Sequence, residues 1–204
     1  MRPQHLEILV EERSIAAFLD VLLPKVLSRL TWKVHEHGSK RDLLTRLPNR
    51  LRGYRGWLSS GTRVLVLVDR DADDCRELKH SINAAAEGAG MITRGSANRD
   101  AFEFAARIVI EELESWYFGD WEAVRAAYPK VGSTVPSQEP FRDPDAIRGG
   151  TWEAFERVLQ QAGYFSSGLR KVEAARTIAD HIDPSRSRSG SFRAFRDLLA
   201  ELDR

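Results

Sequence analysis

The sequence predicts an α/β fold in which a mostly parallel sheet is flanked by helices and followed by a C-terminal helical extension. Residues Val64 to Val68 form an unbroken apolar run, which is typical of a strand buried on both faces. Strand-like and helix-like segments alternate through the first half of the chain, as they do in parallel sheets built from βαβ units. The segments after residue 150 are helix-like only.

The first strand is predicted at His5–Val10, where short apolar residues precede two glutamates. Ser14 is the predicted N-cap of a helix from Ile15 to about Leu30, with a kink at Pro24. A second strand is predicted at Trp32–Glu36. These three segments form one strand, helix, strand unit.

A second helical stretch is predicted to open at Gly38 and Ser39, because leucines recur there at helical spacing. Pro48 and Gly53 argue against an unbroken helix. After the strand at Val64–Val68 the chain is expected to return as a helix. The later predictions are a helix at 73–88, a loop at 90–100, a strand at 104–110 and a helix at 121–128 capped by Asp120.

We expect residues 1–128 to form the α/β domain, and residues 129–204 to form an irregular loop and a helical extension that packs on the same domain. Helices are predicted at 151–163, 168–182 and 191–202. The connection DPSRSRSGSF before the last helix contains Arg186 and Arg188, which could bind phosphate oxygens. A solvated or mobile connection is the favoured interpretation of that composition.

The composition is that of a globular protein without a membrane span. Of 204 residues, 42% are hydrophobic and 30% are charged, and the longest apolar runs are short. We therefore expect a cytoplasmic location and no membrane partner. Cys75 is the single cysteine, which excludes an internal disulfide and a cysteine-based zinc site.

The net charge of +1 hides a segregation of charge along the chain. Ten lysines and arginines lie between Lys25 and Arg63, against two acids, whereas five acids and no base lie between Glu111 and Glu122. Separate basic and acidic regions are needed by a protein that binds a polyanion on one surface and a divalent metal on another. The alternative is that the basic helix is simply a solvated face, which is the more common case.

Acidic residues follow three of the predicted strands. Because the carboxyl ends of parallel strands meet at one end of a sheet, we expect these side chains to lie close together. Oxygen ligands select Mg²⁺, Mn²⁺ or Ca²⁺, and residues two apart in an extended chain point the same way. The alternative is that these acids cap helices. The residues concerned are Glu11, Glu12, Asp69, Asp71, Asp73, Asp74, Glu112 and Glu114.

Other candidate side chains are assigned to packing or to the surface. His35 and His37 are more often surface or partly buried residues than metal ligands. Trp116 and Tyr117 lie beside the acids and could stack on a base, but core packing is the favoured interpretation.

The motifs LVEERS, VLVLVDRDADDC and ELESWYFGD resemble the TOPRIM domain of topoisomerases, primases and OLD-type nucleases. More closely, they resemble a family of small stand-alone bacterial TOPRIM-like proteins found in defence loci beside ABC or SMC-like ATPases. The motifs cover roughly the first 125 residues, and GLRKVEAA in the helical tail is also similar. The resemblance implies a TOPRIM-like Rossmannoid sheet.

The activity implied by the resemblance is metal-dependent phosphoryl transfer, most simply a nuclease that cleaves DNA or RNA with Mg²⁺ or Mn²⁺. The implied metal ligands are Glu11, Asp69 and Asp71, with Asp73 and Glu114 as additional ligands. Lys171 is the implied stabiliser of the phosphate. The expected partners are nucleic acid, an ATPase subunit and a possible second copy of the chain.

One residue departs from the family pattern. The first glutamate is usually followed by glycine, and here Glu12 stands at that position, where it is a competing ligand. Two other functions remain open. One is a non-catalytic TOPRIM-fold subunit that binds the ATPase or nucleic acid, and the other is a phosphotransferase or phosphatase acting on a small nucleotide.

Overall fold

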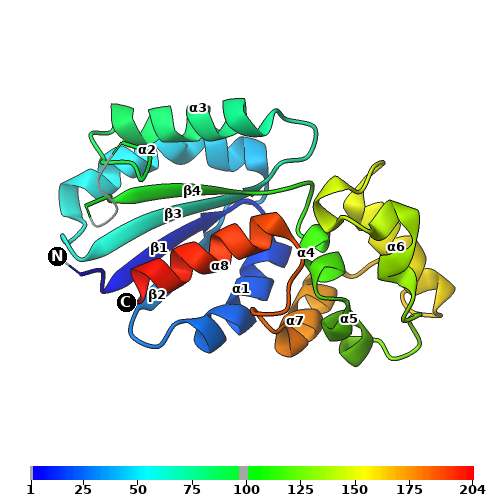
Figure 1. Cartoon of the computed structure of the whole chain (residues 1–204). Helices are drawn as coiled ribbons and strands as arrows, with labels where there is room; N and C mark the ends of the chain where they lie inside the picture. The colour runs from blue at the N-terminus through cyan, green and yellow to red at the C-terminus, as the bar shows by residue number, and fades with distance from the viewer. Residues whose placement is uncertain (1, 97–100) are drawn as a thin grey trace.

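The computed structural model describes residues 2–96 and 101–204 and confirms the predicted α/β fold class. Within these residues, four strands form one sheet in the order β2-β1-β3-β4, and each neighbouring pair is parallel. Because the strands share one direction, their carboxyl ends meet at one end of the sheet (Figure 1). The strands are β1 (His5–Val10), β2 (Thr31–Glu36), β3 (Thr62–Asp69) and β4 (Phe104–Val109).

Helices cover both faces of this sheet (Figure 1). Successive strand residues point to opposite faces, so Leu9 and Val66 pack in the hydrophobic cluster under α2 and α3, whereas Ile8 and Leu65 pack in the cluster under α1 and α8. All eight residues of β3 are buried, as predicted for a strand covered on both sides. The covering helices are α1 (Arg13–Val26), α2 (Lys40–Trp57), α3 (Cys75–Gly88) and α8 (Gly190–Leu202).

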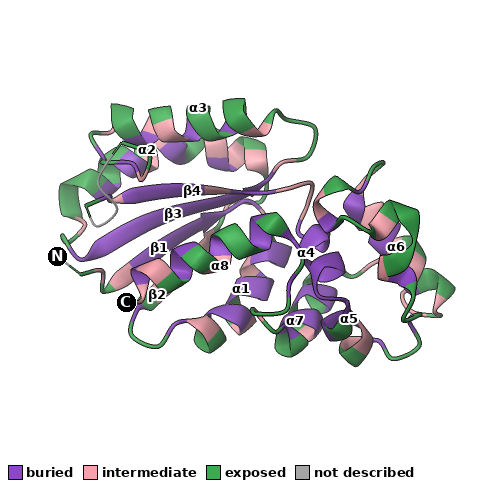
Figure 2. Ribbon diagram, in the orientation of Figure 1, coloured by how far each residue is buried: buried purple, intermediate pink, exposed green. Residues whose placement is uncertain are grey.

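The remaining helices lie beyond the carboxyl ends of the strands (Figure 1). Every residue of α4 is buried, and the cluster on the α1 face continues from the sheet through α4 into α6 and α7 (Figure 2). In the described part of the chain, no helix has the length and apolar composition needed to cross a membrane. These elements are α4 (Glu114–Gly119), α5 (Trp121–Ala127), the 3-10 turns η1 (Val135–Ser137), η2 (Glu139–Phe141) and η3 (Pro144–Ala146), α6 (Thr151–Gln161) and α7 (Lys171–His181).

The ends of α1 differ from the prediction. Its N-cap is Glu12 rather than Ser14, and the Ser14 hydroxyl donates a hydrogen bond to the Glu12 carboxylate at 3.2 Å. The helix ends at Val26, two residues after it passes through Pro24, and not at Leu30. The following residues turn because the Asp203 carboxylate accepts the backbone N–H groups of residues 28, 29 and 30.

The prediction that Pro48 and Gly53 interrupt the second helix is wrong. Helix α2 runs unbroken through both residues. Pro48 removes one helical hydrogen bond, but Leu47 and Leu51 on either side of it are buried against the sheet. Tertiary packing of this apolar stripe outweighs the local preference of the two residues.

The connection from Asp183 to Phe192 is anchored by side-chain hydrogen bonds, although Asp183, Ser185, Arg186, Arg188 and Gly190 are exposed, as predicted for a solvated connection. Arg186 forms two hydrogen bonds with the buried Asp120 carboxylate, at 2.6 and 2.9 Å. Ser189 is fully buried, and its hydroxyl donates to Asp145 at 2.6 Å. The chain here passes so close to Gly119 that a Cβ atom on that residue would lie 2.8 Å from the Ser187 hydroxyl. Arg186 therefore serves folding.

Candidate metal-binding acid cluster

Glu11 and Asp69 meet because they end adjacent parallel strands. Glu11 follows β1 and Asp69 is the last residue of β3. Both side chains are buried, and Glu11 Oε1 accepts a hydrogen bond from the Asp69 backbone N–H at 2.6 Å. The structure thus brings together the first two carboxylates selected from the sequence.

The Asp69 carboxyl group carries an unsatisfied oxygen. Its Oδ1 atom is buried and has no hydrogen-bond partner among the described residues. Burial, followed by the nearby carboxylates of Glu11 and Glu114, raises the pKa of Asp69 well above its ordinary value. A buried oxygen without a donor is unfavourable, so this atom favours a bound proton or a cation.

Two further carboxyl groups, those of Glu11 and Glu114, also have pKa values raised by burial. Burial raises the pKa of Glu11 to about 7, with Asp71 and Glu12 adding to the effect while the Asp69 amide and Lys40 oppose it. Burial likewise raises the pKa of Glu114 to about 7. Glu114 is the first residue of α4, five residues after β4 ends at Val109. Three acids from three strand ends therefore share one poorly solvated region.

Lys171 lies in the electric field of this acid cluster, although it is far away in sequence. It is the first residue of α7 and lines a small hollow together with Glu12 and Gly38. Burial lowers the pKa of Lys171, but attraction by Glu114, Glu12, Glu112 and Asp69 outweighs that effect and the net shift is upward. Its Nζ atom also lies 4.9 Å from the centre of the Trp152 ring.

Asp71 and Asp73 are arranged differently from the prediction. The chain leaves the extended conformation after Asp69, and Asp71 adopts a φ of +50°, so the extended backbone on which the pairing of Asp69 and Asp71 was predicted is not present. Both Asp71 and Asp73 contact Lys40 instead, with Nζ to Oδ2 distances of 2.6 and 2.8 Å.

Lys40 is the site residue that the sequence reasoning missed. Its Nζ atom also donates to the backbone carbonyl oxygens of Asp69 and Arg70, at 3.0 and 3.1 Å. Its side chain is only 16% exposed, so an ammonium group occupies a nest of four oxygen atoms beside Glu11. Its position in the sequence could have indicated this role, because Lys40 begins the helix that follows β2 and therefore lies at the same end of the sheet as the acids.

A backbone contact between the ends of β3 and β4 supports this turn. The Asp71 N–H donates to the Glu111 carbonyl oxygen at 3.0 Å, and Arg70 forms an ion pair with the Glu111 carboxylate. Glu111 has a φ of +60°, so two non-glycine residues adopt the left-handed conformation next to the acid cluster. Such conformations are sparsely populated and persist where the surrounding structure imposes them.

Glu112 and Asp74 bind the N-terminal ends of helices, which is the alternative predicted for acids that follow strands. Glu112 Oε2 accepts the backbone N–H groups of Thr151 and Trp152, both at 2.9 Å, at the start of α6. Asp74 is the N-cap of α3 and accepts two backbone N–H groups. Trp116 and Tyr117 are buried in the core, as the packing interpretation predicted.

With this geometry established, comparisons with known proteins place the chain in a family. Residues 10–203 match the family described as "Domain of unknown function (DUF4276)". The chain belongs to the DUF4276 family. A solved structure of the C-terminal region of the OLD protein of Xanthomonas campestris pv. campestris is similar over 97% of this chain and 94% of that chain, with 19% sequence identity and a TM-score of 0.43. No curated protein matches.

The acid cluster of this DUF4276 protein suits a hard divalent cation in its donor chemistry. Its ligands are oxygens, and the partnerless Oδ1 atom of Asp69 has an electron pair available. Across residues 2–96 and 101–204, no three acidic, histidine or cysteine side chains are already arranged around one ion position. Coordination would therefore need rotation of side chains such as Asp71, whose carboxylate is turned toward Lys40.

Proposed function

We propose that this protein is a Mg²⁺- or Mn²⁺-dependent nuclease that cleaves DNA or RNA phosphodiester bonds. The observation that carries the proposal is the buried and partly unsatisfied Asp69 carboxyl group, held beside Glu11 and Glu114 at the carboxyl ends of parallel strands. Ligand sites of open α/β sheets lie at this end. Crowded carboxylates are costly in a protein unless a cation compensates their charge.

Glu11, Asp69 and Glu114 would hold the metal, with Asp71 and Asp73 as ligands that must first leave Lys40. Bound divalent ions would lower the pKa of a water molecule and neutralise charge on the scissile phosphate. Lys171 would donate to a non-bridging phosphate oxygen, because it lines the hollow beside Glu12 and its ammonium group is attracted by Glu114 and Asp69.

The surface beside the acid cluster would bind the nucleic acid backbone. Helix α2 exposes Arg41, Arg46, Arg52 and Arg55, and its first residue is Lys40 at the acid cluster. Arginine side chains bind phosphate oxygens without reading base sequence. The motifs shared with the stand-alone TOPRIM-like proteins of defence loci further support a role in anti-phage defence with an ATPase partner.

Cleavage of plasmid DNA and tRNA tests this proposal directly. Wild-type protein is assayed with Mg²⁺, Mn²⁺ or EDTA, alone and with a candidate ABC or SMC-like ATPase partner. We expect metal-dependent cleavage that Asp69→Asn abolishes and that Asp20→Asn retains, because Asp20 is exposed on α1. A stable complex with the ATPase and no cleavage under any condition would overturn the nuclease and support a non-catalytic binding subunit.

A further inference from the structure

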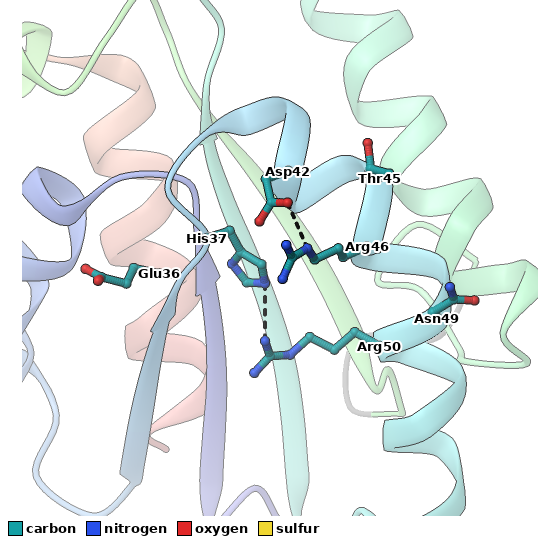
Figure 3. Close-up of a pocket in the computed structure, with 7 residues that line it drawn as sticks. All are labelled: Glu36, His37, Asp42, Thr45, Arg46, Asn49 and Arg50. Atoms are coloured by element: carbon teal, nitrogen blue, oxygen red, sulfur yellow. Dashed lines mark hydrogen bonds and ion pairs between the residues drawn. The ribbon is translucent and has the colours of Figure 1, made fainter.

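An open hollow of about 640 Å³ lies between the end of β2 and helix α2, beside the acid cluster. His37, Arg46 and Arg50 line it, and Figure 3 shows their side chains pointing toward one another while Glu36 points away. The hollow is joined to the acid cluster through the backbone. His37 Nδ1 contacts the carbonyl oxygen of Val10, the residue before Glu11, at 3.0 Å.

His37 holds Arg50 in a defined orientation. Because the Val10 carbonyl can only accept, Nδ1 of His37 carries the proton and donates it. The other ring nitrogen, Nε2, then accepts from Arg50 Nη1 at 3.2 Å. The histidine therefore connects the backbone next to Glu11 with the guanidinium group in the hollow.

A buried network holds the other side of the Arg50 guanidinium. Its Nε atom donates to the Tyr54 hydroxyl at 3.0 Å, and that hydroxyl donates to Glu7 Oε2 at 3.0 Å. Tyr54 and Glu7 are 4% and 6% exposed. Holding a long arginine side chain in one orientation costs rotamer entropy, and these hydrogen bonds to buried groups offset that cost before a ligand binds.

Of the two arginines that line the hollow, the fixed one has no charge partner among the described residues. Arg46 pairs with Asp42 at 2.7 Å, and Glu36 pairs with Arg13 at 3.2 Å. Arg50 forms no ion pair with any residue in the described ranges; its contacts are His37 and Tyr54. Among the described residues its Nη2 group has no hydrogen-bond partner, so this group is available to a ligand.

We infer that this hollow is a binding site for a backbone phosphate of nucleic acid, with Arg50 as its fixed ligand and His37, Tyr54 and Glu7 as positioning residues. The inference rests on the proposed function, because it places a flanking phosphate of the strand that is cleaved at the acid cluster. A guanidinium group fits phosphate oxygens in geometry and charge. Arg46 and Asn49, which also line the hollow, add hydrogen-bond donors.

Binding measured in EDTA tests the site independently of cleavage. Anisotropy of labelled DNA and RNA oligonucleotides is followed for wild type, Arg50→Gln, Arg50→Lys and Tyr54→Phe, with Arg157→Gln on the exposed surface of α6 as the control. We expect Arg50→Gln to weaken binding on the order of tenfold and to reduce the salt slope by about one. Tyr54→Phe weakens binding less, and Arg50→Lys recovers the salt slope but not the full affinity.

A second readout follows the His37 ring by NMR during titration with inorganic phosphate and with a mononucleotide. We expect both to shift its resonances in wild type and neither to do so in Arg50→Gln. Equal oligonucleotide affinity of Arg50→Gln and wild type would overturn the inference, even if the wild type cleaves. If the wild type binds oligonucleotides but never cleaves them, and Arg50→Gln loses that binding, the phosphate site is upheld and the proposed nuclease activity is contradicted. A mononucleotide that binds more tightly than every oligonucleotide would also overturn it.

Discussion

The backbone N–H of Asp69 donates a 2.6 Å hydrogen bond to Glu11 Oε1, across the two central strands of the sheet. This contact fixes the Glu11 carboxyl beside the Asp69 side chain in a buried region. One hydrogen bond does not compensate the burial, because the pKa of Glu11 is still raised to about 7. The protein thus keeps carboxyl groups close together that repel one another in the absence of a cation.

The metal-free protein should lose stability as pH rises from about 5 to about 8. The pKa of Glu11 and of Glu114 is raised from 4.5 to about 7, so the folded state binds more protons than the unfolded state in this window. The free energy of unfolding therefore falls as pH increases, by on the order of 3 kcal/mol for each group. Urea denaturation in EDTA across this range measures it. A flat profile, or one that rises, contradicts the assigned shifts.

Asp69→Asn should separate stability from activity. The amide keeps the shape of the side chain and cannot ionise, whereas burial raises the pKa of the Asp69 carboxyl and makes its ionisation unfavourable in the folded protein. We therefore expect the melting temperature in EDTA at pH 8 to increase by several degrees. Metal-dependent cleavage should be lost in the same variant. Differential scanning calorimetry and plasmid cleavage on one preparation measure both effects. A variant that is less stable and still active would show that Asp69 serves folding only.

Lys40→Met should increase the affinity for Mn²⁺ several-fold. The ammonium group of Lys40 lies within 2.8 Å of Asp71 and Asp73, and it competes with a metal for both carboxylates. The same substitution should lower the melting temperature in EDTA, because these acids lose their counter-charge. Isothermal titration calorimetry gives the affinity, with Lys33→Met on the exposed edge of β2 as the control. Unchanged or weaker binding would mean that Lys40 orders the metal ligands instead.

Asp120→Ala should destabilise the protein without changing the metal site. The Asp120 carboxylate is buried and accepts from Arg186 and from the Asp183 backbone N–H at 2.9 Å. Its loss removes the charge-assisted hydrogen bonds that hold Asp183 and Arg186, which costs on the order of 2 kcal/mol. Urea unfolding measures the loss against Glu122→Ala, an exposed change on α5. An effect below about 1 kcal/mol would show that the connection before α8 is not anchored there.

The sheet could be predicted because its determinants are local. The apolar run of β3 and the acids at strand ends are visible in short windows of sequence, and parallel order follows from the alternation with helices. The unbroken helix α2 could not be predicted, since Pro48 and Gly53 are local signals and the compensating packing of Leu47 and Leu51 is tertiary.

The candidate site could be predicted only in part, for a similar reason. Glu11, Asp69 and Glu114 are close because parallel strands end together, a relation that the order of elements implies. The contact of Lys40 with Asp71 depends on the left-handed conformation of Asp71, which no spacing reveals. The role of Glu112 depends on an α6 start 39 residues away. The metal, its ligands and the partners remain predictions.

The metal site at the ends of β1 and β3 is tested by calorimetric titration of Mn²⁺ into the wild type and into the Glu11→Gln/Asp69→Asn double variant. Both substitutions preserve side-chain shape, so we expect the double variant to fold. Melting curves check this before the titration. We expect saturable binding to the wild type at or below millimolar Mn²⁺ and no saturable binding to the double variant. Equal binding by both proteins, or no binding by the wild type, would contradict a metal site at the carboxyl ends of β1 and β3.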